Sequence, residues 1–302
     1  MNAIPKYCSD LSSEVAEPLY GTAPRTDTWI LLEYPFPLEK KAFEESVLPD
    51  AVKQHLRKEQ ERLPNPRLQL IHNKAYSRKS GFSFFVVQTS DKYTHMVRDH
   101  IASYLDLLEL DLLSMITNSQ AESENNSNEP IFLVCTNGKR DRCCAKNGVE
   151  IFAGLSDYAK SAVWQSSHVG GHRFAANMVC FPHGIYYGRV RPGDAATLVD
   201  AYRAGQLVLK QYRGRACYNP EQQSAEYYLR THTGITAVDD LWLTDTQELG
   251  SDRYQIQFGS KAGVSYQVRI RSALSEYKIF ESCSSPEKLV HQNLFYLESI
   301  SR

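Results

Sequence analysis

Three cysteines and two histidines in the middle of the chain form the pattern most able to do chemistry. Eight residues separate Cys135 from Cys144, which directly follows Cys143, and three residues separate His168 from His172. Two thiolates and two imidazoles are a complete donor set for a metal centre. Zinc accepts such a set, but structural zinc sites usually pair cysteines about two to four residues apart. We therefore expect a larger cofactor, an iron–sulfur cluster, with ligands from two separate loops.

Histidine ligands would change the electrostatics of such a cluster. An oxidised [2Fe–2S] core with two thiolates and two neutral imidazoles has no net charge, whereas four thiolates leave it negative. Because an added electron is less opposed in the neutral centre, we expect a raised reduction potential, toward roughly −150 to +300 mV rather than roughly −400 mV. Each imidazole also keeps an N–H, so electron transfer is expected to couple to proton transfer.

The elements predicted around these residues would position them on a sheet. An apolar run at residues 131–134 predicts a strand that ends at Cys135, and a basic loop with Cys143 and Cys144 follows it. We then expect a helix near residues 149–158, a strand at 163–164 that leads into the histidines, and a hairpin over 177–190. Residues 195–204 predict a helix with Asp194 as its N-cap. This order resembles a thioredoxin-like sheet.

We divide the chain into four parts. Residues 1–116 predict an α/β unit with strands at 29–34, 68–72 and 82–87, a helix after Pro49, and an amphipathic helix from Val97 to Leu112. Residues 117–129 are almost entirely polar and predict a linker to a domain at 130–222. Residues 223–302 are expected to be a β-rich extension that follows a short helix near residues 221–229, because apolar and polar side chains alternate from Tyr254 onward and predict an antiparallel meander. No internal repeat is visible by eye.

The composition is that of an ordinary soluble globular protein, with 42% hydrophobic and 23% charged residues and a net charge of −1. Nothing in it points to nucleic acid or to an anionic membrane. We find neither a membrane-spanning run nor a signal-peptide pattern, so we expect a cytoplasmic location. The seven cysteines are an odd number and do not form a disulfide framework in a reducing compartment. Outside the central cluster we expect them to be buried or surface thiols.

Two segments together resemble a known family. The run Leu133–Cys144, followed by Ser167–Asn177, is similar to the sucrase/ferredoxin-like family of thioredoxin-like ferredoxins, and the resemblance covers roughly residues 27–215. It implies a thioredoxin-like ferredoxin domain, here preceded by a smaller or related α/β unit and followed by the β meander.

The resemblance also implies a [2Fe–2S] cluster bound by two cysteines and by the histidines of a His-X-Gly-Gly-His motif. Transferred to this chain, the ligands are Cys135, Cys144, His168 and His172. Counting from Asp141 or from Cys135 selects Cys144, whereas counting from Arg142 selects Cys143. Cys143 therefore stays open as the alternative to Cys144.

Residues beside these ligands would support the site, and we single out Lys139, Arg140, Asp141, Arg142, Gly170, Gly171, Arg173 and Asn177. The two glycines allow tight curvature and close approach of a cofactor between the imidazoles. Asp141 and Asn177 either orient ligands or stabilise turns. The basic residues, with Arg189 and Arg191, form either a docking face for an unidentified acidic redox protein or a solvated basic surface.

These observations favour an electron carrier without an enzymatic activity of its own. Two alternatives stay open: a metal-free thioredoxin-like thiol oxidoreductase and a zinc-stabilised interaction protein. Thiol oxidoreductases of the thioredoxin type usually carry a Cys-X-X-Cys sequence, and this chain has none. Sucrose cleavage, suggested by the family name, needs a positioned carboxylate pair, and none stands out near either motif.

Overall fold

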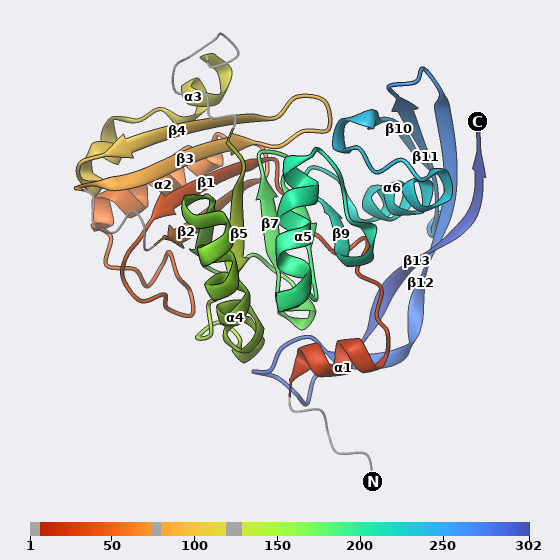
Figure 1. The fold of residues 1–302 in the computed structure, drawn as a ribbon, viewed down its shortest axis with the longest axis horizontal. Helices are drawn as coiled ribbons and strands as arrows, with labels where there is room; N and C mark the ends of the chain where they lie inside the picture. The colour runs from red at the N-terminus through yellow and green to blue at the C-terminus, as the bar shows by residue number, and fades with distance from the viewer. Residues whose placement is uncertain (1–6, 74–79, 119–128) are drawn as a thin grey trace.

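The computed structural model describes residues 7–73, 80–118 and 129–302, which contain two β-sheets (Figure 1). The larger sheet has nine strands in the order β4-β3-β1-β2-β6-β5-β7-β8-β9, and the smaller has four in the order β10-β11-β12-β13. This is the predicted α/β fold with a C-terminal antiparallel sheet. Most of the predicted linker, residues 119–128, lies outside the described residues, and the domain boundaries stay a prediction.

The second half of the large sheet has the thioredoxin-like order. Its elements are β5 (Ile131–Cys135), α4 (Arg142–Ala159), β6 (Val163–Ser166), β7 (Met178–Phe181), β8 (Ile185–Tyr187) and α5 (Pro192–Arg203). β5 pairs in parallel with β6 and antiparallel with β7, which pairs antiparallel with β8. The spatial order β6-β5-β7-β8 places the first strand of the unit in its interior.

The first half repeats this topology. Its elements are β1 (Thr28–Glu33), α2 (Asp50–Glu61), β2 (Pro66–His72), β3 (Phe82–Gln88), β4 (His95–Ile101), the 3-10 helix η1 (Tyr104–Glu109) and α3 (Leu112–Asn118). β1 pairs in parallel with β2 and antiparallel with β3, which gives the order β2-β1-β3-β4. The two units join edge to edge where β2 pairs antiparallel with β6. The chain therefore holds a repeat of topology that its residues do not show, because different apolar side chains fill equivalent layers.

The prediction of an amphipathic helix from Val97 to Leu112 is wrong. Its first part is β4, which pairs with β3 from Phe82↔Ile101 to Gln88↔His95. Ser103 then begins η1 with a capping box to Asp106, and α3 begins only at Leu112. A strand followed by 3-10 turns reproduced the helical spacing of apolar residues, and strand pairing decided the conformation.

Two predicted helices also begin elsewhere. α4 begins at Arg142, so Cys143 and Cys144 lie in its first turn and not in a loop. α5 begins at Pro192 with Arg191 as its N-cap, so the prediction of Asp194 as the cap is wrong. Proline has the helical φ and lacks the N–H that a first turn leaves unpaired, and it therefore starts the helix earlier.

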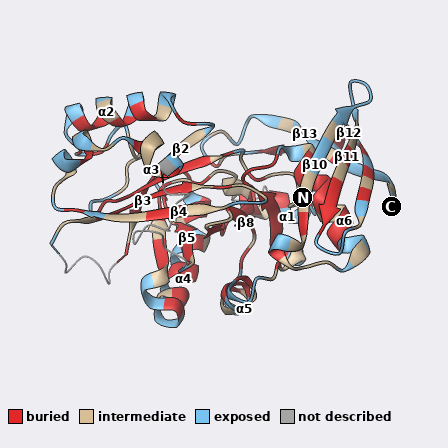
Figure 2. Cartoon of the chain, turned by 90° about the horizontal axis from the view of Figure 1, so that it is seen from above, coloured by how far each residue is buried: buried red, intermediate tan, exposed pale blue. Residues whose placement is uncertain are grey.

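Three apolar layers hold the large sheet together. α2 and α3 pack against β1 and β3 on the outer face of the first unit, and α4 and α5 pack against β5 and β7 on the second. The inner face of both units shares one core, which contains Leu31 of β1, Leu133 and Cys135 of β5, and Cys144. Figure 2 shows buried residues along the strands and exposed turns on the outer sides of α2 and α4. No helix of the described residues is long and apolar enough to cross a membrane.

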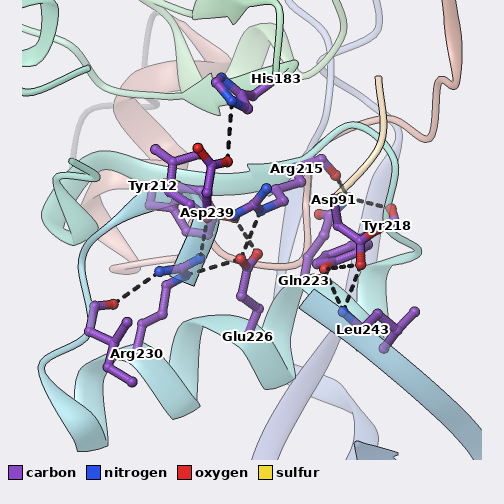
Figure 3. A network of polar contacts seen from close by, with 12 residues as sticks. Asp91, His183, Tyr212, Arg215, Tyr218, Gln223, Glu226, Arg230, Asp239 and Leu243 are labelled. Atoms are coloured by element: carbon purple, nitrogen blue, oxygen red, sulfur yellow. Dashed lines mark hydrogen bonds and ion pairs between the residues drawn. The ribbon is translucent and has the colours of Figure 1, made fainter. Parts of the chain in front are cut away.

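The C-terminal part begins after β9 (Tyr212–Arg215) with α6 (Pro220–Thr233) and continues with β10 (Leu241–Glu248), β11 (Arg253–Ser260), β12 (Ser265–Phe280) and β13 (Leu289–Ser301). Glu226 of α6 accepts hydrogen bonds from Arg215 at 2.9 Å and from Arg230 at 3.0 Å, and all three side chains are fully buried (Figure 3). This network ties α6 to the edge of the large sheet.

The helix α1 (Cys8–Glu14) packs against β12, and it lies below α5 at the bottom of Figure 1. α1 and the connection between β12 and β13 therefore both reach the start of α4, which carries two of the three central cysteines.

Candidate metal centre

The four predicted ligands lie at one end of the thioredoxin-like unit. Cys135 is the last residue of β5, and its N–H donates to the Asn177 carbonyl at 3.1 Å. Cys144 lies in the first turn of α4, His168 follows β6, and His172 begins a short 3-10 helix. Both cysteines are buried, and both histidines are partly exposed.

The structure brings three of the four donor groups tightly together. His168 Nδ1 lies 3.7 Å from Cys144 Sγ and 3.9 Å from Cys135 Sγ, and the three atoms all lie within 4.8 Å of one another. The His172 ring lies beside the His168 ring, with the centroids 5.0 Å apart. Its Nε2 lies 3.7 Å from Asp141 Oδ2. Its Nδ1 is buried and has no hydrogen-bond partner among the described residues.

This arrangement fits the implied cofactor. A buried nitrogen without a partner is unfavourable unless a ligand occupies it. The Nδ1 of His172 is such an atom, and it belongs to a ring adjacent to the other three donors. Thiolate and imidazole donors suit iron–sulfur clusters and zinc. Cys135, Cys144, His168 and His172 therefore form a donor set that a [2Fe–2S] cluster would accept.

The electrostatics favour one thiolate before any metal binds. The hydrogen bond from Cys144 lowers the pKa of the Cys135 thiol well below its ordinary value, and the same bond raises that of Cys144. Burial lowers the pKa of His172 below its ordinary 6.5. A neutral imidazole is the form that coordinates a metal.

Asp141 fixes the start of α4. As the N-cap residue, it accepts a hydrogen bond from the Cys143 N–H at 2.9 Å. Burial alone would raise the pKa of the Asp141 carboxyl. The hydrogen bonds from Cys143 and Cys283 and the interaction with His172 outweigh burial, so the pKa lies below its ordinary value. Asp141 therefore stays an anion beside the His172 ring.

Gly148 sets the distance between α4 and β5. A Cβ atom at this position would collide with the carbonyl oxygen of Cys135. Sequence reasoning missed this residue, although a glycine inside a helix is a signal of close packing.

The glycines of the histidine loop serve the protein's own packing. Gly170 has a φ of 99° and Gly171 a φ of 71°, and a Cβ at Gly171 would collide with the guanidinium of Arg213. A Cβ at Gly170 would collide with Pro24. The two positive φ angles agree with the tight curvature expected of this loop, and the close approach of a cofactor between the imidazoles stays a prediction.

Arg213 stabilises the loop between the two histidines through hydrogen bonds. It is fully buried and donates to the Gly170 carbonyl at 3.1 Å and to Asn177 Oδ1 at 2.8 Å. Asn177 in turn donates to the Gly171 carbonyl at 2.9 Å. Asn177 thus braces the loop between the histidines, and sequence reasoning missed Arg213 as its partner.

Comparison with known proteins identifies the family. The sucrase/ferredoxin-like family model matches residues 19–214. The chain belongs to the sucrase/ferredoxin-like family.

Curated relatives match a shorter segment. Altered inheritance of mitochondria protein 32 of Meyerozyma guilliermondii is 33% identical over 104 residues, and its counterpart in a Saccharomyces cerevisiae strain is 28% identical over 101. These matches cover 30% and 29% of this chain. They span about a third of those relatives, 36% and 32% of their lengths. A thioredoxin-like [2Fe-2S] ferredoxin from Aquifex aeolicus matches 30% of this chain and 94% of its own at 17% identity, with a TM-score of 0.26.

In this family member, acidic partners occupy part of the basic neighbourhood. Exposed Lys139 pairs with Glu39 at 2.5 Å, and Arg173 pairs with Glu17 at 2.9 Å and with Glu281 at 3.1 Å. Arg189 donates to the Ser12 carbonyl. Arg142 and Arg191 are exposed, and Arg140 is partly exposed. The basic surface is therefore smaller than the sequence suggests.

The structure also separates the two adjacent cysteines. Cys144 Sγ lies beside His168, whereas Cys143 Sγ lies 3.4 Å from Cys8 Sγ and 3.3 Å from Cys283 Sγ. Sequence reasoning missed Cys8 and Cys283 because they lie 135 and 140 residues from Cys143.

Proposed function

We propose that this protein transfers single electrons through a [2Fe–2S] cluster bound by Cys135, Cys144, His168 and His172. The supporting observation is the grouping of the Cys135, Cys144 and His168 donor atoms within 4.8 Å of one another at the end of the thioredoxin-like unit. The partnerless buried Nδ1 of His172 lies in the adjacent ring. When bound, such a cluster supplies reversible one-electron chemistry.

The protein's own residues would give the two sides of the site different roles. Cys135 and Cys144 are buried in the inner core, which excludes water from the thiolate side. The histidines are partly exposed, so electrons would enter and leave past the imidazoles. His172 would hold a proton at Nε2, which faces Asp141 Oδ2 at 3.7 Å. A carboxylate behind a ligating histidine fixes its orientation and its proton.

An acidic redox protein is the proposed partner. Arg140 and Arg142 precede and begin α4 next to the ligand Cys144, and their side chains reach solvent. Charge complementarity mainly raises the rate of encounter. The double variant Arg140→Glu/Arg142→Glu should lower the reduction potential of the protein only modestly, because both side chains reach solvent, which screens their charges. It should slow reduction of an acidic ferredoxin, and the difference should shrink at high salt.

The deciding experiment is a metal and sulfide analysis of protein purified without oxygen. We expect a brown-red protein with two irons and two acid-labile sulfides per chain, and an electron paramagnetic resonance signal after one-electron reduction. A colourless protein with one zinc bound by Cys135, Cys144 and the histidines would overturn the proposal and favour the zinc-stabilised alternative. A metal-free protein that reduces disulfides through these cysteines would favour the thiol oxidoreductase. Cys217→Ser, at a buried cysteine outside the site, is the control.

The proposed location is the cytoplasm, as expected from the sequence. The name of the fungal relatives concerns mitochondria. Fractionation of cells that express the full-length protein, with antibody detection, distinguishes the two. Recovery with the mitochondrial fraction after protease treatment of intact organelles would contradict a cytoplasmic location.

A further inference from the structure

A second cluster of metal-ligand side chains lies beside the candidate metal centre and shares none of its four proposed ligands. It consists of Cys8, Cys143, Cys283 and Asp141, and we name it the Cys3Asp cluster. The sulfur of Cys143 lies 3.4 Å from that of Cys8 and 3.3 Å from that of Cys283, and the remaining sulfur pair is 3.6 Å apart. Asp141 Oδ1 lies 3.9 Å from the Cys8 sulfur. We propose that the Cys3Asp cluster is a structural zinc site.

The distances between the donor atoms fit a single ion. Zinc–sulfur bonds of about 2.3 Å in a tetrahedron place the sulfurs about 3.8 Å apart. The three observed separations of 3.3 to 3.6 Å are close to this value. A disulfide would require about 2.05 Å, and all three cysteines are free. Three mutually adjacent thiols also cannot all be satisfied by one disulfide, whereas one zinc ion engages all three.

Burial indicates a structural and not a catalytic role for this ion. Cys8 and Cys143 are completely buried, Asp141 is 2% exposed and Cys283 is 9% exposed. Structural zinc sites have four protein ligands and no open position, which three thiolates and one carboxylate would provide here. Each thiol would release its proton to solvent as the metal binds. The Cys8 N–H, which points at the Cys283 sulfur at 3.4 Å, would stabilise the resulting thiolate charge.

The origin of the ligands explains what the ion would do. Cys8 begins α1, Cys143 lies in the first turn of α4, and Cys283 lies between β12 and β13. The apolar core at this point is small: among the described residues, Ala175 and Phe280 are buried beside the three cysteines, and Tyr7 and Leu11 pack against them partly buried. A small core needs an additional cross-link to hold separate segments. The zinc would fasten α1 and the connection between β12 and β13 to the start of α4.

Asp141 would connect this site to the candidate metal centre. Its carboxylate accepts hydrogen bonds from the Cys143 N–H at 2.9 Å and from the Cys283 N–H at 2.8 Å. The same carboxylate faces His172. Asp141 also caps the first turn of α4, in which Cys144 lies, and it does so through its own hydrogen bond to the Cys143 N–H, whether or not the zinc is bound.

Metal analysis of the full chain tests this inference separately from the proposed function. Protein purified without oxygen and passed over a desalting column with a weak chelator should retain one zinc per chain, whatever its iron content. Cys8→Ser and Cys283→Ser should each lower the retained zinc by at least about tenfold and leave the iron unchanged. Cys217→Ser is the matched control, because Cys217 is 7% exposed and lies outside both clusters, and it should keep both metals. Cys135→Ser should lose iron and keep zinc.

The zinc site would be overturned if the wild-type protein held no zinc after growth with added zinc, or held copper(I) instead. A disulfide between two of the three cysteines would also overturn it. So would zinc that is lost from Cys135→Ser but kept in Cys283→Ser. The last result would place the ion at the candidate metal centre.

A measurement on the wild-type protein tests the zinc site even if a cysteine variant does not fold. A strong chelator should release the zinc and make Cys8 and Cys283 react at least about tenfold faster with an alkylating reagent, read by mass spectrometry, while Cys217 is unchanged. Equal reactivity before and after chelation would contradict the proposal.

Discussion

The sulfurs of Cys143 and Cys144 face two different clusters although the residues are adjacent in the chain. Cys144 Sγ lies 3.7 Å from His168 Nδ1, and Cys143 Sγ lies 3.4 Å from Cys8 Sγ. Successive side chains on an α-helix point about 100° apart, since a turn takes about 3.6 residues. Once Asp141 begins α4, one cysteine faces the end of β5 and the other faces α1.

The first prediction separates the two cysteines. Cys144→Ser should lose most of the bound iron, because a hydroxyl replaces a thiolate ligand, whereas Cys143→Ser should retain it. Iron and sulfide per chain, with the visible absorption spectrum, measure both. The reverse pattern, with iron lost from Cys143→Ser alone, would assign the ligand to Cys143.

The second prediction concerns the histidine ligands. His168→Cys or His172→Cys should keep a cluster and lower its reduction potential by on the order of 100 mV, because a thiolate adds negative charge. The potential should also depend less on pH, because a thiolate has no N–H to titrate. Potentiometric titration at several pH values measures both effects.

His183→Cys is the control for these variants, because His183 lies in the β7–β8 turn and pairs with Asp239. An unchanged potential in both ligand variants would rule out histidine ligation.

The third prediction concerns Gly171. Gly171→Ala should destabilise the fold by about 1–3 kcal/mol and weaken iron retention, because alanine is strained at a φ of 71° and its Cβ would collide with Arg213. Gly205→Ala has a similar φ of 69° but open space around it, so it should show only the backbone cost. Denaturant unfolding and iron analysis measure the pair. Equal effects in both variants would mean that the contact with Arg213 is unimportant.

The fourth prediction concerns the buried Arg215–Glu226–Arg230 network. Burial opposes the charge of Glu226, but the attraction of Arg215 and Arg230 outweighs it and lowers its pKa below the ordinary 4.5. A lowered folded-state pKa contributes stability above the unfolded-state value, and this stability is lost as the pH falls through the folded-state pKa. Glu226→Gln should therefore lower the free energy of unfolding by about 3–5 kcal/mol at pH 7, and by less in acid.

Urea unfolding at pH 7 and at pH 4 tests this prediction. Glu298→Gln, which removes a solvent-exposed pair with Arg253, is the control and should change stability by less than about 1 kcal/mol. A Glu226 effect that is small or independent of pH would show that its charge does not stabilise the fold.

The sequence determined the chemistry and many of the elements. The cysteines and histidines, their spacing and the family resemblance can be read locally. Apolar alternation or continuity over a few residues reflects burial, and it therefore predicts strands locally. This applies to the strands at residues 29–34, 68–72, 82–87 and 131–134 and to the C-terminal meander. The donor set of the candidate metal centre was therefore predictable as residue types.

Tertiary structure decided which of these residues meet. The pairing of β4 with β3 overrode a helical pattern, and the start of α4 separated Cys143 from Cys144. Cys8 and Cys283, 275 residues apart, approach only because α1 and the β12–β13 hairpin pack against the same helix end. Contacts across such separations depend on how complete layers pack, and local periodicity holds no information about that packing.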